Sequence, residues 1–189
     1  ATMSQITYAT STVAAAPDFA YAGYYKGSGT GNQTAGYLAG AVPGTTNAGK
    51  YVYATSTSTA LPGKLSQARS ESGGTGNSTN GYFSGNGTRT DRVVFSTDTF
   101  TYVPGANLLK SVDGGAATSS STAGYLNGGS NPSNTQGTSD VDKLTYSNEP
   151  MSSLPSSADT AQQRMSFMGF SARQYANGET MSVSTPNVI

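Results

Sequence analysis

The 189-residue sequence contains no cysteine, no histidine and no tryptophan, and only 11% of its residues are charged. Without cysteine it can form no disulfide, zinc–thiolate site or iron–sulfur cluster, and without histidine it can form no Ser-His-Asp triad. Its ten basic and ten acidic residues cancel, so no basic surface for nucleic acid is expected. No apolar run approaches the roughly 20 residues of a membrane-spanning helix. We therefore expect no cofactor, no metal, no nucleic-acid partner and no membrane insertion.

Small polar residues dominate what is present. Serine, threonine, glycine and asparagine together supply 89 residues, nearly half of the chain. Disordered chains are typically highly charged and poor in aromatic residues, whereas this chain has 12 tyrosines and 6 phenylalanines. Tyrosine, threonine and valine favour strands, and glycine, asparagine and serine favour turns. The composition therefore predicts an all-β protein with many short strands.

An internal repeat organises these residues. A segment that reads long polar, apolar, variable, aromatic, small and polar occurs four times. The copies are Gln5–Ser11, Lys50–Ser56, Arg92–Asp98 and Lys143–Glu149, and their aromatic residues are 45, 42 and 51 positions apart. A fixed period of this size is the sequence signature of repeat architectures. We expect the recurring aromatic residues Tyr53, Phe95 and Tyr146 to be buried at equivalent places in the core.

Two further anchors accompany each copy of the repeat. A Gly-Tyr segment, degraded to Gln-Tyr in the fourth copy, follows the first aromatic residue by 29, 29, 30 and 29 positions. Its tyrosines are Tyr37, Tyr82, Tyr125 and Tyr175, and the prolines between the two anchors are Pro17, Pro62, Pro104 and Pro155. The length variation follows the second anchor, at 41–48, 86–90 and 130–139. Variable surface loops on a rigid scaffold are where binding residues are usually found.

Each repeat offers four short strands. The first is the alternating segment, the second ends at the proline, and the fourth is the Gly-Tyr segment. A looser third strand is expected at Ala68–Ser72 in the second repeat and at Arg164–Met168 in the fourth. Four strands in 42–51 residues match one blade of a β-propeller. The whole chain, 1–189, is thus expected to form a single repeat domain, with repeats at about 4–48, 49–90, 91–141 and 142–189.

The motif resembles a Kelch-type blade. The resemblance rests on Gly81–Gly85, on Asp91–Ser96, on the threonine-rich strand that ends at Val103-Pro104, and on Leu65–Arg69, which resembles the segment with the family's arginine. That arginine is present only around Arg69 and Arg164, and the family's tryptophan is missing. The pattern is most similar to the Kelch-like repeats of tail-fibre and virion structural proteins of cyanobacterial phages.

The predicted fold is an all-β propeller of four Kelch-like, four-stranded blades. The chain opens on an alternating segment and closes on a Gly-Tyr segment, so Gln174–Gly178 is expected to pair beside Gln5–Thr10. Such circular closure removes open sheet edges. The alternatives are a piece of a larger propeller of six or seven blades, and a ring completed by several protomers.

The resemblance implies a non-enzymatic protein of a virion or extracellular surface. Its role would be a fibre or decoration module that mediates assembly or binds a host glycan or protein. Its partners would be other virion or fibre subunits, including copies of itself, with a host-surface glycan as a further ligand. Four aromatic residues off the repeat anchors are the candidate binding residues: Tyr21, Tyr24, Tyr25 and Tyr102.

The carboxylates carry the alternative function, a propeller glycosidase or lyase acting on polysaccharide. Glycosidases need two carboxylates at a fixed separation, and a pocket holding such a pair would favour this reading. Asp91 and Asp142 occupy equivalent repeat positions, as do Asp98 and Glu149. This repetition favours a structural role at turns and strand ends. The segment Asp140-Val141-Asp142 could contact a cation, but it lacks the spacing of an EF-hand.

Overall fold

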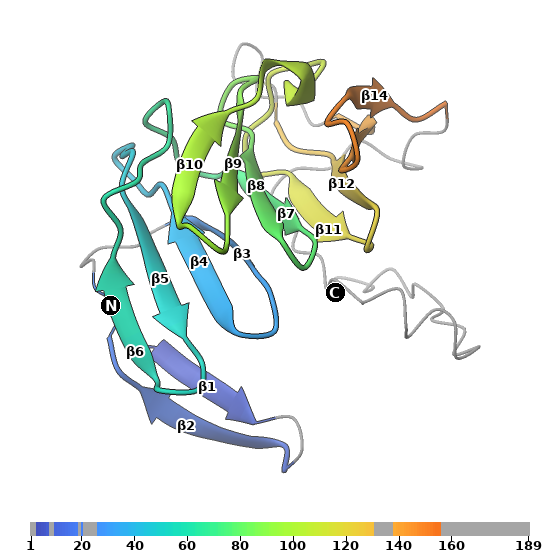
Figure 1. Ribbon diagram of the computed structural model, residues 1–189. Helices are drawn as coiled ribbons and strands as arrows, with labels where there is room; N and C mark the ends of the chain where they lie inside the picture. Colours follow the sequence, from blue (N-terminus) through green and yellow to red (C-terminus); the bar gives the residue numbers. More distant parts are fainter. Residues whose placement is uncertain (1–2, 8–9, 19, 21–25, 131–137, 156–189) are drawn as a thin grey trace, which may run out of the picture.

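The computed structural model describes residues 3–7, 10–18, 20, 26–130 and 138–155. Within these residues the chain forms three four-stranded antiparallel sheets and one two-stranded hairpin (Figure 1). One short 3-10 turn, Pro104–Ala106, follows the second sheet. The described residues contain no helix with the length and apolar character that crossing a bilayer would require. The all-β prediction is confirmed.

Each sheet is a simple meander of four consecutive strands. The first sheet contains β3 (Ser28–Gly31), β4 (Ala35–Ala39), β5 (Ala48–Val52) and β6 (Thr57–Ala60). The second contains β7 (Gly73–Gly76), β8 (Asn80–Ser84), β9 (Thr90–Val94) and β10 (Thr99–Tyr102). The third contains β11 (Ala116–Ser119), β12 (Ala123–Asn127), β13 (Val141–Thr145) and β14 (Met151–Ser153). The N-terminal hairpin contains β1 (Met3–Thr7) and β2 (Thr12–Ala16).

The repeat pattern explains most of these strands. The Gly-Tyr segments form β4, β8 and β12, and the alternating segments form β1, β5, β9 and β13. The hairpin turn after each alternating strand holds a polar residue with positive φ at the same place: Ser11 at 52°, Ser56 at 50°, Asp98 at 55° and Glu149 at 61°. Short polar side chains are the non-glycine residues best suited to this left-handed region. The turn chemistry therefore repeats along with the strands.

The predicted third strand was misplaced. Residues 68–72 form a link with one isolated bridge at Arg69, and the strand itself is β7, Gly73–Gly76. Each sheet also begins with this strand, one element before the Gly-Tyr strand. Glycine-rich strands have a weak sequence signal. The glycines are required because neighbouring sheets meet here, and a Cβ at Gly74 would lie 1.8 Å from the carbonyl oxygen of Gly29 in β3.

Aromatic stacks join one sheet to the next. Tyr37 of the first sheet stacks on Phe95 of the second at 4.9 Å, and Tyr82 stacks on Tyr146 of the third at 5.2 Å. All four side chains are buried, which confirms Phe95 and Tyr146 as core anchors. Tyr53 was expected to be equally buried, and this is wrong: it is 43% exposed.

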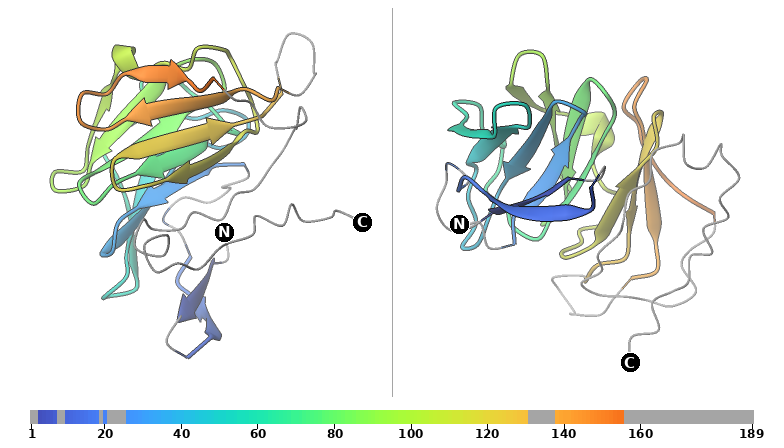
Figure 2. Two further views of the ribbon diagram at one scale, coloured as in Figure 1. Left: turned by 90° about the vertical axis from the view of Figure 1, so that its right-hand side faces the viewer. Right: turned by 90° about the horizontal axis from the view of Figure 1, so that it is seen from below.

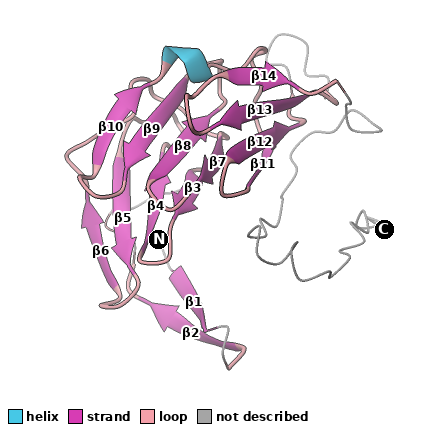
Figure 3. Ribbon diagram, turned by 45° about the vertical axis from the view of Figure 1, so that its right-hand side comes forward, coloured by secondary structure: helices cyan, strands magenta, loops and turns pink. Residues whose placement is uncertain are grey.

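The sheets form an open arc in the described part of the chain. Figures 1 and 3 show them side by side with their innermost strands together, and β7 contacts both β3 and β11. The N-terminal hairpin lies next to the first sheet, and the third sheet lies at the opposite end of the arc (Figure 2). The described sheets therefore do not close a ring. The predicted closing segment, Gln174–Gly178, lies outside the described residues.

Candidate binding cleft between the second and third sheets

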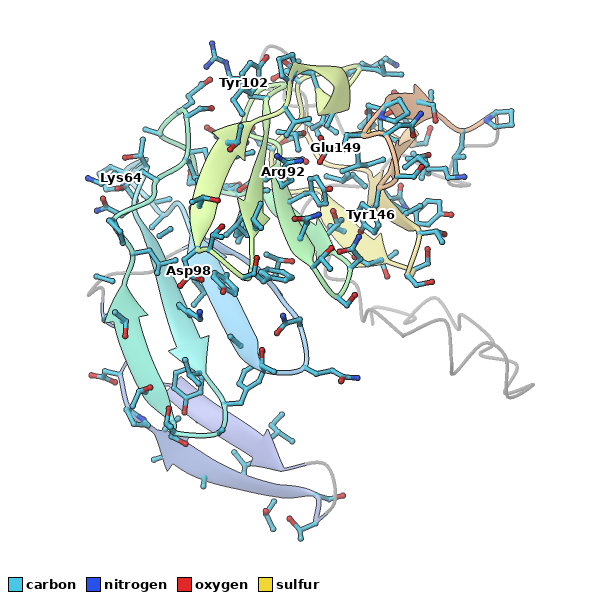
Figure 4. All side chains as sticks on the ribbon, in the orientation of Figure 1. Lys64, Arg92, Asp98, Tyr102, Tyr146 and Glu149 are labelled. Atoms are coloured by element: carbon cyan, nitrogen blue, oxygen red, sulfur yellow. The ribbon has the colours of Figure 1, made fainter. Side chains whose placement is uncertain are left out.

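Charged side chains join neighbouring sheets at two places, and we call each of these contacts a clamp. Arg92 of β9 donates to Glu149 in the hairpin turn of the third sheet at 2.7 Å, and the Tyr82 hydroxyl donates to the same oxygen at 2.9 Å (Figure 4). The first and second sheets repeat this arrangement. Lys50 donates to Asp98 at 2.9 Å, and the Tyr37 hydroxyl donates to the same carboxylate at 2.6 Å.

Each clamp therefore joins a tyrosine and a cation of one sheet to an acid of the next. Burial and the hydrogen bond to the acid both raise the pKa of Tyr82 above its usual value, and the pKa of Tyr37 is raised for the same reasons. Both hydroxyls thus stay protonated and able to donate. The repeated acids Asp98 and Glu149 have the structural role that their repetition predicted.

A third charged pair joins β9 of the second sheet to the link that precedes this sheet. Arg69, in the link between the first and second sheets, donates to Asp91 of β9 at 2.5 Å, and both side chains are 1% exposed. Its other terminal nitrogen donates to three backbone carbonyls, those of Phe83, Gly85 and Arg89, at 3.2, 3.4 and 2.7 Å. Four acceptors thus hold this guanidinium group. Asp91 is held in turn by the Ser66 amide at 3.0 Å.

The third sheet has the same aspartate but lacks the arginine. Val112 occupies the position of Arg69, because the Val112 carbonyl accepts the Asn86 amide as the Arg69 carbonyl accepts the Ala41 amide. Asp142 occupies the position of Asp91: one oxygen accepts the Leu109 amide at 3.2 Å, as Asp91 accepts the Ser66 amide. The Asp142 residue is only 9% exposed. No cation is paired with it within the described residues.

A cleft of about 170 Å³ opens where that arginine would lie. Its walls come from the second sheet, from the third sheet and from the links that precede and follow the second sheet. The described residues that line it are Glu71, Gly73, Ser84, Gly85, Leu108, Leu109, Lys110, Val112, Gly115, Leu126, Gly128, Thr138, Asp140, Asp142 and Ser153. Three of these residues are acidic and one is basic, so the cleft favours a positively charged occupant.

The two aspartates of the cleft have opposite environments. Burial raises the pKa of Asp142, and the neighbouring charge of Asp140 adds to this effect; the Leu109 amide and the charge of Lys110 partly offset it. Hydrogen bonds from Lys110 and Thr138 instead lower the pKa of Asp140. Close by, burial and the charge of Glu71 raise the pKa of Asp113. A bound cation would therefore stabilise the charged form of Asp142.

Of the four predicted binding residues, Tyr102 alone lies in the described part of the chain. Tyr102, on β10, is absent from the lining of the cleft; its hydroxyl accepts a hydrogen bond from Asn107 at 2.8 Å, and the Arg89 guanidinium lies 4.9 Å from its ring centre. Tyr21, Tyr24 and Tyr25 lie outside the described residues. The sequence interpretation assigned Asp142 a structural role because it repeats Asp91. The signal that this interpretation missed is that Asp142 repeats Asp91, whereas the arginine that pairs with Asp91 is not repeated in the third sheet.

Metal binding finds no support in the described ranges, where no three acidic side chains converge as a metal site would require. The segment Asp140-Val141-Asp142 contributes two carboxylates to the cleft, and Lys110 is paired with one of them.

Comparisons with known proteins identify a fold and no family. No protein-family model matches the chain, and no curated protein matches its sequence. Matching chains of solved structures number 152, and a shared fold does not by itself indicate a function. One of them, titled "Structure of YjhT", has a TM-score of 0.67 and 10% sequence identity, and the match covers 80% of this chain and 57% of that chain. The chain thus spans little more than half the length of that structure, and it is similar to it in fold.

Proposed function

We propose that the chain is a β-propeller in which the three sheets are blades and the N-terminal hairpin is the outer half of a fourth. The equivalent residues of the four alternating strands support this. Val93 and Leu144 are fully buried and Tyr51 is nearly so, whereas Ile6 of the hairpin is 55% exposed. Val13, which pairs with Ile6, is 67% exposed. A two-stranded hairpin is marginally stable alone, so these apolar residues need further strands to cover them.

In the proposed ring the last Gly-Tyr segment supplies the inner strand that pairs with the hairpin, one of the two strands that the fourth blade still needs. We take the register of this pairing from the three described sheets, in which Tyr37 lies opposite Lys50, Tyr82 opposite Arg92, and Tyr125 opposite Lys143. By the same register Tyr175 would lie opposite Gln5.

Two observations support the alternative, a larger ring of which this chain is a part. The clamp position of the hairpin turn holds Ser11, so a hairpin packed on the third sheet would offer Lys143 no acid. The structure titled "Structure of YjhT" is also considerably longer than the matched region.

For function we propose a non-catalytic binding and assembly module of a virion or extracellular surface. The observation that carries the non-catalytic reading is the use of the repeated carboxylates. Asp91, Asp98 and Glu149 are all engaged in ion pairs that hold sheets or links together. Its partners would be other fibre or virion subunits, including its own copies, and a host-surface glycan. The polar, weakly charged sequence and the resemblance to phage fibre repeats support this location.

Binding and turnover should be measured on the same ligands. A panel of immobilised neutral glycans would report binding, and release of reducing ends from the same glycans in solution would report hydrolysis. We expect saturable binding without turnover. Reducing-end release that disappears in Asp142→Asn would refute the non-catalytic role. Absence of binding, together with assembly of the purified chain into fibres, would limit the role to structure.

A propeller glycosidase or lyase remains the second candidate because of the two cleft aspartates. Asp140 and Asp142 line one cleft, with the pKa of the first lowered and that of the second raised. Environments that separate two carboxyl pKa values are typical of acid and base pairs in glycosidases. Asp142 would be the general acid. The hydrolysis measurement with Asp142→Asn separates this candidate from the binding role.

A further inference from the structure

The cleft between the second and third sheets matches, residue for residue, the site that holds Arg69 in the second sheet. The four groups that accept from Arg69 belong to Phe83, Gly85, Arg89 and Asp91. Strand register makes their third-sheet counterparts Leu126, Gly128, Asp140 and Asp142, because Phe83 pairs with Asp91 as Leu126 pairs with Asp142. All four counterparts line the cleft. We propose that this cleft binds a guanidinium group supplied from outside the sheet.

The link between the sheets supports this equivalence independently of the strands. Leu65 and Leu108 are each 3% exposed and lie four residues before Arg69 and Val112. The Gly85 backbone lies against the Val112 carbonyl as the Gly40 backbone lies against that of Arg69. The backbone around the site is therefore retained while the side chain that fills it is shortened to valine.

The size of the cleft suits such a group. A water molecule has a share of about 30 Å³ in the liquid, so a cleft of about 170 Å³ has room for the four heavy atoms of a guanidinium and part of its alkyl chain. Leu108, Leu109 and Leu126 line it and can contact that chain.

The charges of the cleft select a cation. Glu71 is paired with Lys26, and Asp140 is paired with Lys110, whose side chain is 66% exposed. Asp142 is the buried carboxylate of the cleft with no paired cation in the described chain. An uncompensated buried charge is costly, so a cation that reaches Asp142 gains both charge pairing and hydrogen bonding.

The acceptor geometry favours guanidinium over ammonium. Arg69 divides its two terminal nitrogens between a carboxylate and three carbonyls. A planar guanidinium has five N–H donors in a fixed fork, whereas a lysine ammonium has three on a single atom. The Asp140 carbonyl already accepts the Gly128 amide at 3.2 Å, and a carbonyl oxygen has a second lone pair for the ligand.

We assign the guanidinium to an arginine side chain of a protein segment. This step rests on the proposed binding and assembly role, in which subunits or host proteins dock on the module. Free arginine or agmatine would offer the same group, and the test below separates these sources.

The test titrates the full chain with three blocked amino acids: Nα-acetyl-arginine amide, its neutral isostere Nα-acetyl-citrulline amide, and Nα-acetyl-lysine amide. Amide chemical shifts in the third sheet report binding. We expect the arginine amide to bind with a Kd on the order of 1 mM. Citrulline and lysine amides should each bind at least about tenfold more weakly, a difference of about 1.4 kcal/mol. Equal shifts with arginine and citrulline amides would overturn the proposal.

Two variants locate the binding. Asp142→Asn keeps the shape and the acceptor for the Leu109 amide, and it should weaken arginine-amide binding at least about tenfold. Val112→Arg supplies the arginine from within, so it should abolish binding and raise the melting temperature. Val112→Met is the matched control, because it adds bulk without charge and should not raise the melting temperature. Unchanged arginine-amide binding in folded Val112→Arg would place the ligand elsewhere and refute the assignment.

The source of the guanidinium is decided by comparing a blocked Gly-Arg-Gly peptide with L-arginine and agmatine. Tighter binding of the peptide supports an arginine of a docked protein. Tighter binding of L-arginine or agmatine supports a guanidinium site but overturns its assignment to a protein. A negative titration would leave the glycan and fibre measurements unaffected, so failure here is distinct from failure of the proposed function.

Discussion

Two equivalent aspartates with different partners give a direct test of how the sheets are stabilised. Asp91→Asn removes the carboxylate that pairs with Arg69, and both side chains of this pair are 1% exposed. Breaking a buried pair while leaving one charge behind costs about 3–5 kcal/mol, against a typical domain stability of about 5–15 kcal/mol. Asp142→Asn removes a buried carboxylate that has no paired cation in the described chain, so it should be neutral or stabilising. Urea unfolding followed by tyrosine fluorescence measures both.

The pH dependence of the change in unfolding free energy caused by Asp142→Asn provides the control. Burial raises the folded-state pKa of Asp142 above 3.8, so the folded chain binds this proton more readily than the unfolded chain. The contribution of Asp142 to stability is therefore most favourable at low pH and is lost as the pH rises through the folded pKa. The gain from Asp142→Asn should be largest at neutral pH and should shrink on acidification. A cost for Asp142→Asn as large as that for Asp91→Asn would refute the reasoning.

Three further predictions follow from the packing of the sheets. Phe95→Ala should cost about 3–5 kcal/mol in urea unfolding, because a buried and stacked ring is removed; a loss below about 1 kcal/mol would show that the ring is not core. Gly74→Ala should lower the melting temperature far more than Gly105→Ala, since the first Cβ meets backbone at 1.8 Å and the second meets nothing closer than 3.4 Å; equal shifts would contradict the close approach of the inner strands. Ser11→Asp should raise the melting temperature if the N-terminal hairpin packs on the third sheet, because the new carboxylate would face Lys143, which has no ion-pair partner among the described residues; Ser56→Asp should give no gain, and no difference between the two variants would favour the larger ring.

The repeat anchors made much of the fold predictable. The glycine of a Gly-Tyr strand leaves room for the aromatic residue that follows the next strand: the Phe95 ring lies 3.0 Å from where a Cβ of Gly81 would be. Because the glycine and the aromatic ring contact each other, the two recur together in each of the three sheets. The same reasoning misplaced β7, whose glycines are required by the neighbouring sheet and leave no local pattern of strand residues.

The candidate site was less visible in the sequence. Asp142 resembles Asp91 in position, and the repeat favoured the same role for both. Their difference lies in a residue 30 positions earlier, Val112, whose equivalence to Arg69 depends on backbone hydrogen bonds. Tyr102 was selected as an aromatic residue off the repeat, but the structure gives it local partners in Asn107 and Arg89.

The central claim, that the chain's own last repeat completes the N-terminal hairpin as a fourth blade, can be tested with one disulfide. The chain has no cysteine, so Gln5→Cys with Tyr175→Cys introduces a single pair. Directly opposed residues of antiparallel strands have Cα atoms about 4.5–5.5 Å apart, within the range of a disulfide. Tyr125→Cys with Lys143→Cys is the control, because these residues are opposed in the third sheet.

We expect both pairs to oxidise within one chain, giving monomers with the mass of a single disulfide on non-reducing analysis. A disulfide-linked dimer from the Gln5→Cys and Tyr175→Cys variant would show that a second copy completes the blade. No disulfide in that variant, while the control pair oxidises, would contradict closure within the chain and favour a larger ring.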